Sequence, residues 1–170
     1  MARPHPAPSS NAPAHTLTEL VLEVFRLNGD LLAAGDELVG DLGLTSARWQ
    51  VMGAIALSPV PLPVSHIARN MGLTRQSVQR IVDDMRAGGL VRLEPNPHHR
   101  RASLVALTDD GLSAYASASV RQERWASDLA AGLPAQGIAD AIMMLRTVRQ
   151  RLDDAADQTT PLAEAAMSDA

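Results

Sequence analysis

Residues 62–108, LPVSHIARNMGLTRQSVQRIVDDMRAGGLVRLEPNPHHRRASLVALT, carry two short helical patterns followed by two strand-like runs. Within them, Ala68, Gly72 and Val78 have the spacing of a helix-turn-helix. The alanine lets the two helices cross closely, the glycine permits a tight turn, and the valine packs back between the helices. The segment therefore predicts a helix-turn-helix followed by a β-hairpin.

The second helix of this pair has a clear start and end. Thr74 is a favourable N-cap residue, and Gly88 and Gly89 end the helical pattern. Apolar residues recur at positions i, i+3, i+4 and i+7, namely Val78, Ile81, Val82 and Met85. This periodicity predicts one buried face and one polar face.

The polar face of that helix is rich in arginine and glutamine, which can bind guanine and adenine edges in a DNA major groove. We expect base contacts from Arg75, Gln76 and Gln79, and phosphate contacts from Thr74, Ser77 and Arg80. A solvated polar face without a ligand would show the same spacing, so the helix alone does not decide between the two.

The strand-like runs strengthen the DNA interpretation. Residues 90–93 and 103–107 are mostly apolar and read as two short strands, and they flank a proline-containing tip that ends in Arg100 and Arg101. A hairpin with adjacent arginines at its tip, directly after a helix-turn-helix, is typical of a wing. We expect Arg100 and Arg101 to enter the neighbouring minor groove, where the negative potential is deepest.

These residues resemble the winged-helix domain of the MarR family of bacterial transcriptional regulators. The family order is a helix-turn-helix, a Gly-Leu-Val strand, a wing tip with Asp-Arg, and Leu-Thr with a glycine opening a long helix. Here the matching segments are 89–91, 99–101 and 107–108 with Gly111. His99 replaces the wing aspartate, so the aspartate–arginine pair that orders the tip in the family is not available.

Composition excludes several other classes of protein. The 170 residues include no cysteine, which excludes thiol redox sensing, disulfides and thiolate zinc sites. Aromatic residues make up 2%, which argues against a base-stacking single-strand binder and for an aliphatic, mainly helical core. The chain has neither an 18-residue apolar run nor a signal-peptide core, so we expect a cytoplasmic protein that does not enter the membrane.

Charge is distributed unevenly along the chain. The net charge is −4, but residues 65–101 contain seven arginines against three carboxylates, a local charge of +4, and the remainder is acidic at −8. A basic segment on an acidic body fits a specific DNA-binding protein, in which the distribution of charge matters more than its sum.

The flanking segments predict a mainly α fold, with a small β-wing and dimerisation helices on both sides of the winged helix. We expect a regulator domain over 16–155, with the winged helix at about 45–108 and dimerisation helices at about 16–39 and 108–155. Residues 1–15 and 156–170 are expected to be disordered tails. Gly35 and Asn28 interrupt the first apolar stripe, which we interpret mainly as a helix crossing.

The resemblance implies two partners besides double-stranded DNA. The family pairs its terminal helices into a twofold homodimer, which would read an inverted-repeat operator with two heads about one DNA turn apart, roughly 34 Å. It also often holds a small effector between the first helix, the helix after it and the long helix after the wing. Residues at these positions are Asn28, Trp49, Met52 and Tyr115.

Enzymatic and metal chemistry find little support. The sequence has no phosphate-binding loop, serine elbow or cysteine nucleophile, and no cofactor is expected. His98 and His99, with His66, leave a metal-sensing interpretation open but lack a well-spaced further ligand. We therefore expect a DNA-binding repressor relieved by an effector. The alternative is a winged-helix protein–protein adaptor or dimerisation module without specific DNA binding.

Overall fold

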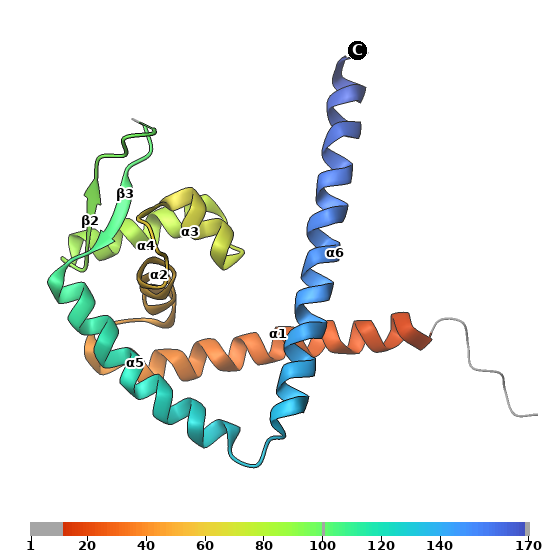
Figure 1. The fold of residues 1–170 in the computed structure, drawn as a ribbon, viewed down its shortest axis with the longest axis horizontal. Coiled ribbons are helices and arrows are strands. Elements are labelled where there is room, and N and C mark those ends of the chain that lie inside the picture. Colours follow the sequence, from red (N-terminus) through yellow and green to blue (C-terminus); the bar gives the residue numbers. More distant parts are fainter. Residues whose placement is uncertain (1–11, 100, 169–170) are drawn as a thin grey trace, which may run out of the picture. The chain divides into compact units, whose positions relative to one another are not determined.

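The computed structural model describes residues 12–99 and 101–168, and the side chains as far as residue 155. The elements in chain order are α1 (Ala12–Val39), the 3-10 helix η1 (Gly40–Leu42), α2 (Ser46–Ala56), β1 (Leu62–Pro63), α3 (Val64–Met71), α4 (Arg75–Ala87), β2 (Val91–Glu94), β3 (Leu104–Leu107), α5 (Asp109–Ala130) and α6 (Ala135–Ser168). Figure 1 shows them along the chain. Two compact units result, residues 1–124 and 125–170. None of the described helices is long and apolar enough to cross a membrane.

The first unit contains the predicted helix-turn-helix, α3 and α4, followed by the hairpin of β2 and β3 (Figure 1). The turn residue Gly72 adopts a left-handed conformation, with φ 65°. Ala68 and Val78 are buried at 3% and 0% exposure. The roles predicted for these three residues are therefore confirmed.

The sheet has one strand that the sequence did not predict. Strands β2 and β3 pair antiparallel, and β1 adds to the other edge of β3, with Leu62 opposite Val105 and Pro63 opposite Leu104. Pro63 ends β1 and is the N-cap of α3. A proline, which has no N–H to donate, can occupy an edge strand of this kind.

The core lies between α2, α3, α4 and the sheet. Its largest fully buried side chains are Met52, Ile67, Met85, Val39, Val51, Val78, Val82 and Val105. Trp49 packs against this cluster while remaining partly exposed. Side chains of moderate size from helices and strands of the first unit thus meet in one aliphatic core, as the low aromatic content predicted.

Helices α1 and α2 cross at Gly35. A Cβ atom on Gly35 would lie 2.7 Å from the Ser46 hydroxyl oxygen, so glycine lets the two helices approach closely here without displacing that hydroxyl. The neighbouring Asp36 carboxylate accepts a hydrogen bond from the Ser46 backbone N–H at 2.6 Å, at the start of α2. The interpretation of Gly35 as a helix crossing is confirmed.

An ion pair ties α5 to the end of α1. The Arg121 guanidinium donates to both carboxylate oxygens of Asp41, and also to the Leu38 carbonyl at 3.0 Å. These hydrogen bonds lower the pKa of Asp41. The resulting stabilisation is present at neutral pH and is lost as the pH falls through that lowered pKa.

Both terminal helices are longer than predicted. Helix α1 begins at Ala12, within the tail expected at residues 1–15, because Pro13 fits a first helical turn and the Thr16 hydroxyl donates to the Ala12 carbonyl at 3.0 Å. Residues 1–11 lie outside the described part of the chain. Helix α6 continues to Ser168, through most of the expected tail at 156–170, where alanine-rich sequence favours helix.

The end of α4, the wing and the start of α5 meet at one joint. The Thr108 hydroxyl donates to the Gly89 carbonyl at 2.6 Å and accepts from the Gly111 N–H at 3.0 Å. A Cβ atom on Gly111 would lie 2.1 Å from the Leu90 carbonyl oxygen, so the two backbones could not approach as they do. The absence of a side chain at residue 111 is thus a condition of this packing.

We predict that Gly111→Ala lowers the free energy of unfolding by about 1–3 kcal/mol, because the backbone of Leu90 must move. Thermal denaturation followed by circular dichroism would measure this as a shift of roughly 3–10 °C. Gly88→Ala is the matched control, since its Cβ would meet the Asp84 carbonyl at an ordinary 3.5 Å. Equal melting temperatures for the two variants would contradict the role assigned to Gly111.

Candidate nucleic-acid interface

The start of α4 is fixed by its N-cap. The Thr74 hydroxyl oxygen accepts from the Ser77 N–H at 3.1 Å, and the two hydroxyl oxygens of these residues lie 2.8 Å apart. The predicted cap is confirmed. Both hydroxyls were expected to bind phosphate, and the structure shows that they already bind each other, so their first role is to hold the first turn of the helix.

Beyond the cap, α4 presents its polar face outward. Arg75, Gln76 and Arg80 are exposed, whereas Gln79 is partly buried and donates a hydrogen bond to Asp83 at 3.2 Å. This bond holds the Gln79 carboxamide in one orientation. Four of the six residues predicted on this face therefore carry long side chains that can donate hydrogen bonds, namely Arg75, Gln76, Gln79 and Arg80. The amide of Gln79 is in addition oriented by Asp83.

The wing is ordered at its tip by Asn96. Its side-chain oxygen accepts hydrogen bonds from the backbone N–H groups of His98 and His99, at 3.0 and 3.2 Å. This asparagine turn orders the tip where the family would use an aspartate–arginine pair. Arg101 is exposed beside it. The other predicted wing residue, Arg100, lies outside the described residues.

The wing is also fixed at its base by Arg92. Its guanidinium donates to the Leu107 carbonyl at 2.5 Å and pairs with Glu94 at 2.8 Å. Arg92 is therefore one of the seven arginines counted in the basic segment, but its guanidinium is bound within the hairpin and stabilises it.

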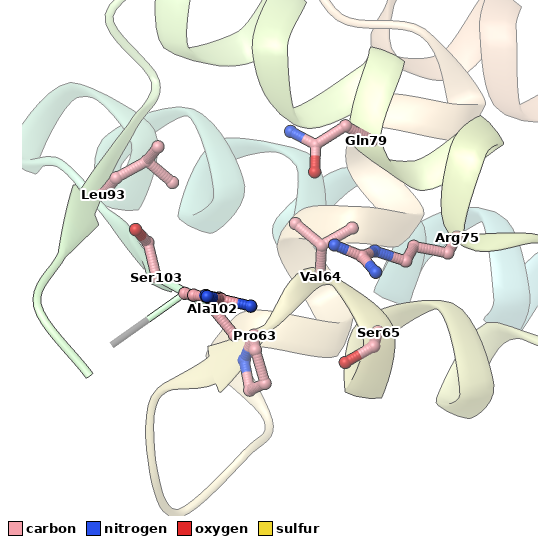
Figure 2. A pocket seen from close by; sticks show the side chains of 9 residues that line it. Pro63, Val64, Ser65, Arg75, Gln79, Leu93, Ala102 and Ser103 are labelled. Carbon is pink, nitrogen blue, oxygen red and sulfur yellow. The ribbon is translucent and has the colours of Figure 1, made fainter. Parts of the chain in front are cut away.

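Helix α4 and the wing enclose a hollow of about 220 Å³, the α4–wing hollow (Figure 2). Its lining residues are Pro63, Val64, Ser65, Arg75, Gln79, Leu93, Arg101, Ala102 and Ser103. In Figure 2 the side chains of Arg75 and Gln79 extend from α4 toward the side on which Ala102 and Ser103 lie. The structure thus brings together residues from both elements predicted to bind DNA.

Two hydroxyl residues of this hollow, Ser65 and Ser103, were not predicted. Ser65 lies in the first turn of α3 and Ser103 precedes β3. Their place beside Arg75 depends on β1, which brings the start of α3 against the wing. Since β1 has only two residues, no sequence periodicity could have indicated it.

The four residues suggested for an effector site have unequal environments. Met52 is fully buried in the core, Trp49 is partly buried, and Asn28 is exposed on α1. Tyr115 lies beside α2, since a Cβ atom on Gly53 would be 3.8 Å from its ring and its hydroxyl. Trp49, Met52 and Tyr115 therefore belong to the packing around α2, and their role toward an effector stays a prediction.

Metal ligation is not evident in the described residues. Histidine, aspartate and glutamate side chains there form no group of three or more that could hold a metal ion. His66, His98 and His99 nevertheless line a second hollow, which lies between the start of α3 and the wing.

Part of this architecture matches a known protein family. Residues 42–102, which include α2, the helix-turn-helix and most of the wing, match the model of the MarR family. Over these residues the chain is similar to the MarR family. The match covers the α4–wing hollow except for Ser103, and it confirms the resemblance seen in the sequence.

The chain also has a curated relative in Mycobacterium tuberculosis. It is 40% identical over 95 residues to the uncharacterized protein Rv2011c of Mycobacterium tuberculosis, which is 56% of this chain and 65% of that protein. The chain thus spans somewhat less than two thirds of the length of this curated relative.

Solved structures show the same fold. The regulator MOSR of M. tuberculosis, in complex with DNA, superposes with a TM-score of 0.66 at 22% identity, covering 78% of this chain and 96% of MOSR. PcaV of Streptomyces coelicolor, in complex with its natural ligand, gives 0.64 at 25% identity, covering 88% of this chain and 98% of PcaV. The mainly α fold with a small β-wing is confirmed by these matches.

Proposed function

We propose that this chain is a sequence-specific DNA-binding transcriptional regulator that acts as a homodimer. The observation that carries the proposal is the α4–wing hollow, in which Arg75 and Gln79 of α4 and Arg101 of the wing line one surface. The second helix of a helix-turn-helix fits a DNA major groove, and a basic wing tip fits the adjacent minor groove. The MOSR complex with DNA is a precedent for this fold on a duplex.

Different side chains would make base, phosphate and minor-groove contacts. Arg75, Gln76 and Gln79 would read base edges, and the Gln79–Asp83 bond favours a defined reading by orienting the amide. Arg80 would bind phosphate. Thr74 and Ser77 would add phosphate contacts through the helix start that they stabilise. Arg100 and Arg101 would enter the minor groove.

The terminal helices support dimerisation. Apolar side chains on α1 and on α6 are more than a third exposed in the single chain, namely Leu17, Val21, Leu22, Phe25, Leu27, Leu31 and Leu32 on α1, and Ile138, Ile142, Met143, Met144, Leu145 and Leu152 on α6. Monomeric proteins rarely expose apolar surface on this scale, so a second copy would cover it. Two recognition helices would then bind an inverted repeat.

Regulation would follow from ligand-dependent spacing of the two recognition helices. A dimer bound across a promoter would exclude polymerase, and an effector that binds the unbound spacing more tightly would release the DNA. PcaV, a regulator of this fold in complex with its natural ligand, supports a ligand site in such a protein. The alternative, a winged-helix adaptor for another protein, would lack sequence preference for DNA.

We predict distinct effects of Arg75→Ala and Arg101→Ala on a duplex obtained by selection from a random DNA pool. Arg75→Ala should cost about 1–3 kcal/mol and relax the preference at one base position. Arg101→Ala should weaken binding to all sequences and lower the salt slope by about 1. Fluorescence anisotropy across a salt series would measure both.

Arg26→Ala is the control for these variants. It removes the same charge from an exposed residue of α1 that pairs with Glu23 at 3.1 Å. Its affinity should match that of the unmodified chain. If all three variants bound alike, neither α4 nor the wing would contact DNA as proposed, and the adaptor alternative would gain support.

We also predict that Ile142→Glu disrupts the dimer, because a carboxylate would be buried in the apolar interface. Light scattering after gel filtration should give the monomer mass of 18.1 kDa for the variant and twice that mass for the unmodified chain. Gln136→Glu, at an exposed polar residue in the first turn of the same helix, is the control and should leave the dimer intact. A dimeric Ile142→Glu variant would contradict the assignment of α6 to the interface.

A further inference from the structure

One hydrogen bond on the polar face of α4 joins a residue proposed to bind DNA to a residue that has no role so far. The Gln79 carboxamide nitrogen donates to a carboxylate oxygen of Asp83 at 3.2 Å. Residues four apart in a helix lie on the same face, so the two side chains are neighbours. Gln79 is partly buried and lines the α4–wing hollow, whereas Asp83 is exposed and does not line it. Asp83 can therefore orient a residue of the hollow from outside the hollow.

This bond determines which polar groups of Gln79 remain available. A carboxamide has one carbonyl oxygen that accepts hydrogen bonds and two N–H groups that donate them. Asp83 occupies one N–H, and within the described part of the chain the carbonyl oxygen has no hydrogen-bond donor. In Figure 2 that oxygen points to the side of the hollow where Val64 lies, and the nitrogen points away from it. Gln79 thus offers one acceptor and one donor to a ligand.

One acceptor and one donor match the major-groove edge of adenine. Adenine presents the acceptor N7 beside the donor N6, so the oxygen and the second N–H of a carboxamide can bind both. Guanine presents two acceptors, N7 and O6, in the same place. An unrestrained amide could direct both of its N–H groups at them, but one N–H of Gln79 is already bound to Asp83. The bond therefore disfavours guanine.

The neighbouring Gln76 lacks this restraint. It is exposed, and its side chain makes no hydrogen bond within the described residues. The Gln79–Asp83 bond, by contrast, has a charged acceptor, which makes it stronger than a bond between neutral groups. A duplex that excludes water from this face would strengthen it further. Of the two glutamines, Gln79 is the one whose amide is oriented before DNA arrives.

We propose that Asp83 is a positioning residue that holds the Gln79 carboxamide so that it selects an adenine·thymine base pair. Gln79 would bind N6 and N7 of the adenine, and Asp83 would itself make no contact with DNA. This inference rests on the function proposed above, and it adds the base pair that Gln79 selects and the residue that enforces the choice.

The first test measures the orientation in the full chain without DNA, by NMR of the side-chain amide groups. Gln79→Ala identifies the Gln79 signals by their loss. We expect Asp83→Ala to shift these signals, because their hydrogen bond is lost. Asp84→Ala is the matched control, since it removes the same charge from the next residue, which is also exposed, and it should leave them in place. Gln79 signals that do not move in Asp83→Ala would overturn the positioning role.

The second test uses fluorescence anisotropy on the selected duplex and on duplexes with one base pair exchanged. The pair that Gln79 contacts is the one at which Gln79→Ala loses its preference. We expect an A·T pair there, which the unmodified chain prefers over G·C by roughly tenfold. Asp83→Ala should lower this preference by at least about threefold. Its affinity for both duplexes should rise, because a carboxylate that repels phosphate is removed.

The ratio of the two affinities separates positioning from charge. Asp84→Ala should keep the ratio of the unmodified chain, whatever its effect on overall affinity. Adding Asp83→Ala to Gln79→Ala should change no base preference, because the oriented amide is already absent.

Three results would contradict the inference and leave the proposed function intact. They are a G·C pair at the position of Gln79, an unchanged ratio in Asp83→Ala, and no loss of preference at any position in Gln79→Ala. Equal binding of the unmodified chain to every duplex would instead overturn the proposed function, and the selection of adenine with it. The NMR measurement would still decide whether Asp83 orients Gln79.

Discussion

The close backbone approach of Gly111 to Leu90 is the constraint on which the DNA-binding half of the molecule depends. At this point the end of α4, the base of the wing and the start of α5 share the hydrogen bonds of Thr108. Because no side chain separates residue 111 from the Leu90 carbonyl, the start of α5 packs directly against the connection between α4 and β2. The two elements that line the α4–wing hollow are thus joined at a packed connection.

A second constraint comes from β1. Its two residues pair with β3 and hold the start of α3 against the wing. This short pairing creates both hollows, since Pro63 and Ser65 line each of them. The α4–wing hollow and the histidine-lined hollow between α3 and the wing are thus neighbouring products of one strand contact.

Much of this could be predicted from the sequence, because it depends on local rules. Thr74 as a cap, Gly72 as a left-handed turn and the apolar stripe through Val78 each follow from the chemistry of one residue in one helix. The strand β1, the Gln79–Asp83 bond and the two hollows could not. They depend on distant segments or on rotamers that meet only after folding.

The same distinction, between local rules and contacts that form only on folding, applies to the ends of the chain and to the residues suggested for an effector. The terminal helices extend beyond the bounds expected from composition, to Ala12 at the start of α1 and to Ser168 at the end of α6. Met52 was suggested as an effector contact by family resemblance, and its complete burial shows that its first role is in the core. The family resemblance identified the winged-helix segment but did not indicate the histidine-lined hollow between α3 and the wing.

The central claim is that α4 and the wing read a DNA sequence. The most direct test is the affinity of the unmodified chain for its selected duplex and for a scrambled duplex of equal length, measured over a salt series. The account predicts a preference of roughly a thousandfold or more, with log affinity falling by about 0.9 per phosphate contact as log salt rises. Weak and equal binding to both duplexes would contradict it.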